Sequence, residues 1–232
     1  MEMTRLASHY LDNLPEVDVA FMLAHPGEAE LLCGATIAKL SAAGKRVAIL
    51  DLTAGEAGTL ARGNTILDEA DRAAEILGVI WRGTMRFPDG RLEDTIMSRM
   101  TVTGEFKRLR PQVVVAMHPE DRHPDSLAAS LLVENAAYLA GLSGLDNYLM
   151  AHSTGRVVFA SASVPALPSF VVDVSPYFEQ KMAALKSYST LFADPAEVLA
   201  RVEREGRRFG DLIGVRYGEP FTQRQALAGD LL

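Results

Sequence analysis

The sequence predicts an α/β fold, with an open, mostly parallel β-sheet and helices on both of its faces. The first observation is that short apolar runs alternate with stretches of helical pattern over the first 150 residues, as successive βαβ units do. The second is that these runs are almost continuously apolar, which is typical of strands covered on both faces. The third is that 232 residues with 48% hydrophobic side chains can close one sizeable core. We therefore expect one domain over residues 1–232.

The expected elements follow one another in regular order. In the first 150 residues the expected strands are 17–24, 46–53, 80–87 and 112–117, and the expected helices are 28–43, 67–77, 94–109 and 124–139. Gly44 and Gly78 end the first two helices, because glycine is common just past a helix end. The alternation then weakens, and the expected elements are strands 157–160 and 170–174 and helices 177–191 and 196–209. The segment after Pro220 has too few apolar residues to predict an element.

Charge and composition limit the class of partner. The net charge of -7 provides no basic surface for nucleic acid or an anionic membrane. No apolar run approaches the roughly 20 residues that span a bilayer, and residues 1–10 carry no signal-peptide pattern. The one cysteine, Cys33, cannot form an intramolecular disulfide, which suits a reducing compartment. We therefore expect a cytoplasmic protein whose partners are small molecules or further copies of itself.

Three loops that follow predicted strands hold the residues suited to chemistry. In an open α/β sheet, ligands bind at the carboxyl ends of the strands. The loops are 24–30 after the first strand, 54–59 after the second and 118–126 after the fourth. We expect them to meet in one crevice.

His25 and Glu28 lie three residues apart at the start of a predicted helix, so both side chains can point into this crevice. A histidine and a carboxylate are suitable zinc ligands, but catalytic zinc has three protein ligands. His118 or His123 could supply the third ligand. The structural alternative is a histidine that is hydrogen-bonded at a strand end and a glutamate that is stabilised by the helix dipole.

The pair His123 and Asp125 is the other candidate for chemistry, because an aspartate near a histidine can fix its tautomer. Asp125 could equally cap the following helix, and the neighbouring Asp121 and Arg122 could form a structural salt bridge. The glycine-rich phosphate loops and the Gly-x-Ser-x-Gly motif are absent from the expected places. Their absence argues against a nucleotide cofactor and against a serine hydrolase.

Segments distributed over residues 17–221 resemble the LmbE/PIG-L de-N-acetylases. Within that family they are most similar to the bacillithiol-biosynthesis branch, which acts on N-acetylglucosaminyl malate. The segments include Ala24-His25-Pro26, Asp51-Leu52-Thr53, Gly55-Glu56, Phe87-Pro88-Asp89-Gly90, Asp121-Arg122-His123-Pro124-Asp125 and Tyr217-Gly218-Glu219-Pro220-Phe221. The resemblance implies a Rossmann-like fold, zinc-dependent hydrolysis of an acetamide on a sugar conjugate, and a homo-oligomer.

The resemblance also assigns positions to the family's active site. Its three zinc ligands, a histidine, an aspartate and a histidine, correspond to His25, Glu28 and Ser126, and its general base corresponds to Gly27. A serine hydroxyl is a poor zinc ligand beside imidazole, and the side chain of glycine has no proton acceptor. His123 and Asp125 match a family histidine that assists the departing amine and an aspartate that orients it.

Two hypotheses follow for the function. In the first, zinc binding is weak or absent, amide hydrolysis is largely lost, and a role in binding a small-molecule sugar conjugate remains, with Gly27 and Arg122 among the substrate-binding positions. In the second, the chain is an active metal-dependent deacetylase whose site is rebuilt from His25, Glu28 and either His118 or His123. The resemblance further implies that the triple change Gly27→Asp, Glu28→Asp and Ser126→His would restore a zinc site.

Overall fold

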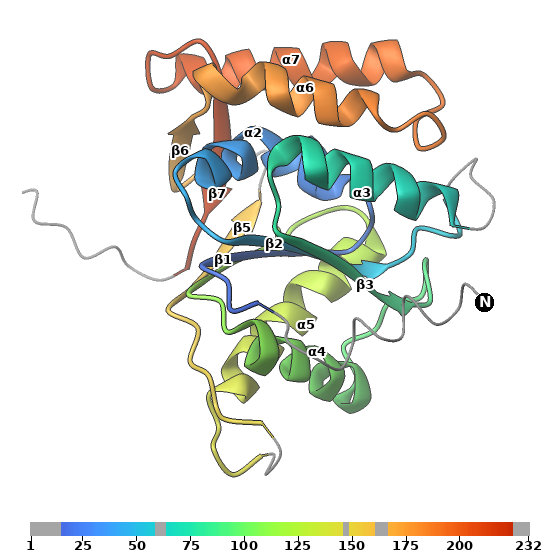
Figure 1. The fold of residues 1–232 in the computed structure, drawn as a ribbon, viewed down its shortest axis with the longest axis vertical. Helices are drawn as coiled ribbons and strands as arrows, with labels where there is room; N and C mark the ends of the chain where they lie inside the picture. The colour runs from blue at the N-terminus through green and yellow to red at the C-terminus, as the bar shows by residue number, and fades with distance from the viewer. Residues whose placement is uncertain (1–14, 59–63, 146–148, 161–166, 225–232) are drawn as a thin grey trace, which may run out of the picture.

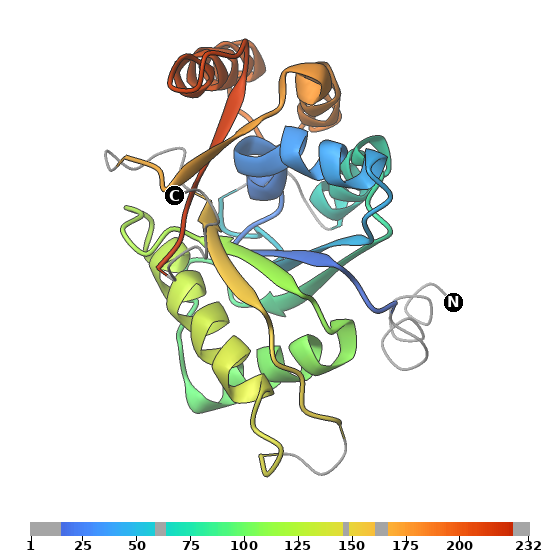
Figure 2. The same cartoon turned by 90° about the vertical axis from the view of Figure 1, so that its left-hand side faces the viewer.

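The computed structural model describes residues 15–58, 64–145, 149–160 and 167–224, and these form a sheet between two helical layers (Figures 1 and 2). The strands are β1 Val19–Leu23, β2 Val47–Thr53, β3 Trp81–Phe87, β4 Val113–Met117, β5 Arg156–Ala160, β6 Phe170–Asp173 and β7 Gly218–Thr222. Their order in the sheet is β3-β2-β1-β4-β5-β7-β6. The first five strands are parallel, and β7 is antiparallel to both β5 and β6. The predicted α/β fold with a mostly parallel sheet is therefore confirmed.

The helices cover both faces of the sheet, as predicted. They are α2 Glu28–Ala42, α3 Thr65–Leu77, α4 Ile96–Leu109, α5 Pro124–Ala140, α6 Phe178–Lys186 and α7 Pro195–Asp211, with a short 3₁₀ turn at Ser175–Tyr177. In Figure 1, α4 and α5 lie below the sheet, whereas α2 and α3 lie above it with α6 and α7 beyond them. Within the described ranges, no helix has both the length and the apolar character needed to cross a membrane.

The central strands are buried along their whole length, which explains their continuously apolar sequences. Every residue of β1 and β2 is buried, as are the last four residues of β4. Helices pack on both sides of these strands, so each strand buries the side chains of both its faces. The carboxyl ends of the central strands are consequently rigid, and the loops that follow them start from fixed positions.

Two elements differ from the sequence-based expectation. The helix expected over 177–191 ends at Lys186. Beyond it, Ser189 and Thr190 donate both their main-chain N–H groups and their hydroxyls to Glu69 of α3, and these bonds hold the segment in a non-helical path. β7 was not predicted at all, because Phe221 is its only large apolar residue and its pairing partners lie about 50 residues or more away in the chain.

A buried charge cluster holds the start of α2 against the sheet. Arg82 of β3 donates from Nε to Asp51 at 2.9 Å and from Nη1 to Glu30 at 2.5 Å. The side chain of Arg82 is only 4% exposed, and an ion pair this deeply buried persists only when its partners are well placed. The cluster therefore joins β2, β3 and the first turn of α2, which carries several of the candidate site residues.

Candidate functional site

A pocket of about 360 Å³ lies where the loops after β1, β2 and β4 meet, at the carboxyl ends of these strands. It is lined by His25, Pro26, Gly55, Ala57, Gly58, Asp89, Gly90, His123 and Leu191. Two of these side chains were not expected in the crevice from the sequence. Asp89 belongs to the Phe-Pro-Asp-Gly segment of the family resemblance, which could have indicated it. Leu191 arrives from the segment after α6, and no local pattern indicated it.

His25 lies between three carboxylates. Glu28 accepts from the main-chain N–H of His25 at 2.9 Å, and its Oε1 lies 2.9 Å from the Nδ1 atom of the same residue. On the other side of the ring, Nε2 lies 3.0 Å from Asp89 Oδ1 and 3.3 Å from Asp125 Oδ2. Both ring nitrogens therefore face negative charge.

These carboxylates determine the protonation of the ring. Burial by itself lowers the pKa of His25, but the hydrogen bond and charge of Glu28, with further contributions from Asp89 and Asp125, outweigh burial and raise the pKa to about 9. In this geometry His25 carries both ring protons at neutral pH.

Asp125 is fixed by the turn after β3. Its Oδ2 accepts from the main-chain N–H of Gly90 at 2.7 Å, and its Oδ1 accepts from that of Leu92 at 3.1 Å. Burial tends to raise the pKa of Asp125, but these hydrogen bonds hold it below its usual value. The carboxylate contacts His25 rather than His123, so neither of the sequence-based alternatives for Asp125, a partner for His123 or a helix cap, describes its observed bonds.

His123 caps the N-terminus of α5. Its Nδ1 accepts from the main-chain N–H of Asp125 at 3.2 Å, so the proton of the neutral ring lies on Nε2. The ring packs edge-on against His25, with 4.9 Å between the centroids. His123 can therefore donate a proton or a hydrogen bond to a bound molecule from Nε2.

Gly27 is the N-cap residue of α2, and its backbone has a φ of 94°. This is a conformation that residues other than glycine rarely adopt. A Cβ atom at this position would overlap Cδ2 of Leu191 and would lie 3.9 Å from Cζ of Tyr188. The expected change Gly27→Asp is therefore strained and sterically opposed, which corrects the triple-change repair inferred from the sequence.

The remaining predicted residues lie in different surroundings. Ser126 is buried in the first turn of α5. His118 is also buried, and its Nδ1 accepts from the main-chain N–H of Glu120 at 3.1 Å. Neither His118 nor the exposed Arg122 lines the pocket. Of the two histidines considered as a third ligand beside His25, the structure thus brings His123 to the site and not His118.

The fold and the site together define an α/β protein with a small-molecule pocket at the carboxyl ends of its parallel strands, lined by imidazoles and carboxylates. Comparison with known proteins specifies the family. Residues 20–137 match the PIG-L family model, described as GlcNAc-PI de-N-acetylase. This chain belongs to the PIG-L family of deacetylases.

Two deacetylases and one further solved structure are similar to the chain over most of its length. The diacetylchitobiose deacetylase of Thermococcus kodakarensis is 31% identical over 214 residues, which cover 84% of this chain and 78% of that protein. The conserved protein TT1542 of Thermus thermophilus is 37% identical with a TM-score of 0.88, over 93% of this chain and 99% of that one. The N,N'-diacetylchitobiose deacetylase of Pyrococcus horikoshii is 23% identical with a TM-score of 0.80, over 95% and 88% of the two chains.

The donors at the three family ligand positions do not suit the zinc that the family implies. Both carboxylate oxygens of Glu28 are bonded to His25, and Ser126 offers a hydroxyl in place of an imidazole. A different set, His25, His123 and Asp125, has one ligand atom from each residue within 4.8 Å of the others. These three are the residues that could hold a metal ion, although the bonds described above already engage atoms of all three.

Proposed function

We propose that this PIG-L family chain binds an N-acetylglucosaminyl conjugate in the pocket beside His25 and hydrolyses its amide slowly or not at all. The observation that carries the proposal is the position of Gly27, where the family's general base would stand and where the side chain of Leu191 lies instead. General-base assistance contributes about 10²–10⁴-fold to such reactions. The loss of this base together with two ligand types leaves a binding site without its hydrolytic groups.

The ligand class follows from the family and its relatives. Relatives of this chain carry the name diacetylchitobiose deacetylase, and the resemblance noted in the sequence is to enzymes of N-acetylglucosaminyl malate. A conjugate of N-acetylglucosamine is therefore the ligand to test first, with Gly27 and Arg122 kept as proposed contact positions. The single domain and the cytoplasmic location predicted from the sequence stay predictions.

The proposal is tested by comparing binding with turnover. Calorimetry with N-acetylglucosaminyl malate is expected to show saturable binding, and an amine-release assay on the same compound is expected to show no product above the uncatalysed rate. Release of glucosaminyl malate at a rate typical of enzymes, about 1 s⁻¹ or faster, would overturn the proposal. No binding at all would overturn it as well.

A metal-dependent deacetylase is the second candidate, and the approach of His25, His123 and Asp125 to within 4.8 Å of one another favours it. In this version Glu28 orients His25 through Nδ1, as carboxylates commonly do for metal-bound histidines. It differs from the rebuilt site inferred from the sequence, in which Glu28 itself was a ligand. His123→Ala would abolish metal binding in this version and leave it unchanged in the first.

The metal content of the purified chain distinguishes the two candidates. We expect zinc well below one atom per chain when the protein is prepared without added metal, because the usual set of three strong ligands is incomplete. Elemental analysis by mass spectrometry measures this ratio. About one tightly held zinc per chain would favour the rebuilt site.

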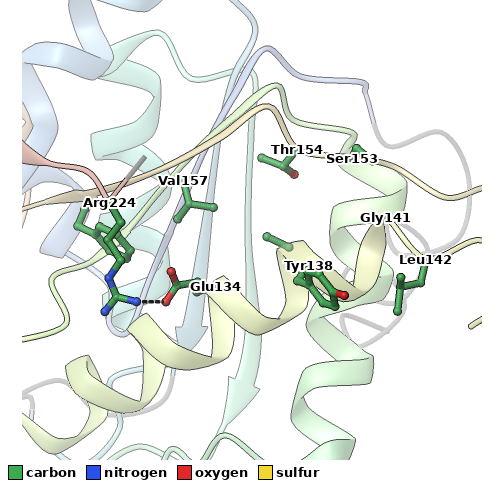
Figure 3. A pocket seen from close by; sticks show the side chains of 10 residues that line it. Glu134, Tyr138, Gly141, Leu142, Ser153, Thr154, Val157 and Arg224 are labelled. Carbon is green, nitrogen blue, oxygen red and sulfur yellow. Dashed lines mark hydrogen bonds and ion pairs between the residues drawn. The ribbon is translucent and has the colours of Figure 1, made fainter. Parts of the chain in front are cut away.

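We also propose that the chain forms a homo-oligomer through the outer face of α5. This helix is apolar on both sides, and helices of that kind are usually covered on both. Its outward side chains Leu127, Leu131, Tyr138 and Leu142 are 41%, 51%, 73% and 39% exposed. Tyr138 and Leu142 border a groove of about 470 Å³, with the ion pair of Glu134 and Arg224 also in its lining (Figure 3).

Light scattering is expected to show an oligomer at micromolar concentration, and the double change Leu131→Asp/Tyr138→Asp is expected to give a folded monomer. The exposed Leu212, which follows α7, supplies a control, since Leu212→Asp should leave the assembly intact. A wild-type monomer across the micromolar range would contradict the proposal.

A further inference from the structure

Leu191 forms part of the apolar lining of the pocket. Pro26 and Ala57 are the other apolar side chains there, whereas His25, Asp89 and His123 are polar. Cδ2 of Leu191 lies where a side chain at residue 27 would begin. A hydrocarbon group therefore stands two residues along the chain from His25, at the place where the family has a carboxylate.

The segment that carries Leu191 is held firmly. The fully buried Glu69 of α3 accepts from the N–H of Ser189 at 3.0 Å, from its hydroxyl at 2.5 Å and from the hydroxyl of Thr190 at 2.8 Å. Burial tends to raise the pKa of Glu69, but these hydrogen bonds hold it below its usual value. Charge-assisted bonds of this kind are about twice as strong as neutral ones.

Buried aromatic packing supports the same segment from beneath. Tyr188 is 2% exposed and packs edge-on against Phe192, with 6.2 Å between the ring centroids. Leu191 is thus anchored on both sides in the sequence, by Thr190 and by Phe192. Moving its side chain away from Gly27 would require these contacts to break.

From this arrangement we infer that Leu191 is a specificity-determining residue that selects an N-acyl amino sugar over the free amine. The inference rests on the proposed binding function and adds the group that is recognised. An acyl chain packs on Leu191 and Pro26, while the amide N–H and carbonyl face Asp89 and His123. A free amine has no apolar group for this surface. One methylene in an apolar pocket changes affinity by about tenfold or more, so the acyl group should be recognised by at least that factor.

The test uses the methyl glycosides of glucosamine, N-acetylglucosamine and N-butyrylglucosamine as calorimetric probes of the full chain. The unchanged chain is expected to prefer N-acetyl over the free amine by about tenfold or more. Leu191→Ala opens space beside Gly27, so the preference is expected to move by about tenfold toward N-butyryl. Leu212→Ala, an exposed leucine outside the pocket, is the matched control and should leave the preference unchanged.

The outcomes separate this inference from the proposed function. If the unchanged chain binds none of the three probes, the proposed function fails. If it binds them but Leu191→Ala has the same order of preference as Leu212→Ala, the role of Leu191 is wrong while the binding function stands. If Leu191→Ala does not fold, Leu191→Val carries the same test, since it removes one methylene and is expected to move the preference in the same direction.

Discussion

The double variant Glu28→Asp/Ser126→His is expected to bind zinc on the order of 100-fold more tightly than the unchanged chain. The variant recreates the ligand set of histidine, aspartate and histidine on the two loops that meet at the pocket. In the unchanged chain, both oxygens of Glu28 are bonded to His25. Changes to groups that merely support metal ligands already alter affinity by about 10–100-fold, so a restored ligand should have at least the larger effect.

Gly27 is left unchanged in this variant for a structural reason. Its φ of 94° and the neighbouring Leu191 oppose any side chain at that position, and residue 27 corresponds to the family's base rather than to a ligand. Hydrolysis is therefore not expected to return with zinc binding. An added Gly27→Asp should be tolerated better when Leu191→Ala removes the overlapping atom.

The measurement is calorimetric zinc titration of the unchanged chain, the double variant and the control Glu28→Asp/Ser126→Ala. Ser126 is 1% exposed, so thermal unfolding must first show that the histidine at this position is accommodated. If the folded double variant bound zinc no better than the control, the correspondence of Glu28 and Ser126 with the family ligands would be wrong.

The free energy of unfolding is expected to fall by about 3 kcal/mol between pH 6.5 and pH 9 when a chelator is present. The pKa of His25 is about 9 in the folded chain and about 6.5 in an unfolded one. A raised histidine pKa stabilises the fold fully below the unfolded value, and this stabilisation is lost as the pH rises through the folded value. A pKa difference of one between the two states corresponds to about 1.4 kcal/mol. The side chain is 17% exposed, so solvent screens its ion pairs little.

Urea unfolding at several pH values measures this dependence. His25→Gln is expected to remove most of the slope, because glutamine does not titrate. His152, which bonds the main-chain oxygen of Pro111 at 2.7 Å, supplies the control, since His152→Gln should preserve the slope. An unchanged slope in His25→Gln would show that the three carboxylates around His25 do not hold its proton.

The sequence by itself determined the architecture of the first 140 residues and the family. Continuous apolar runs predicted β1, β2 and β4, because strands covered on both faces must be apolar on both. Local patterns likewise located the helices between them to within a few residues. The loops after β1, β2 and β4 were expected to meet, since the carboxyl ends of neighbouring parallel strands share one edge of the sheet.

Only the tertiary structure decided how the side chains of the site are paired. Spacing made Glu28 a possible metal ligand, but it could not show that this carboxylate turns back onto His25. Asp89 and Leu191 reach the pocket from segments more than 60 and 160 residues beyond His25 in the chain, and β7 forms by pairing with equally distant strands. Periodicity reports only on neighbours along the chain, whereas these contacts depend on the packing of elements that are remote in sequence. For that reason the positions of the site residues were readable in the sequence, while their bonding partners and the apolar side chain beside Gly27 were not.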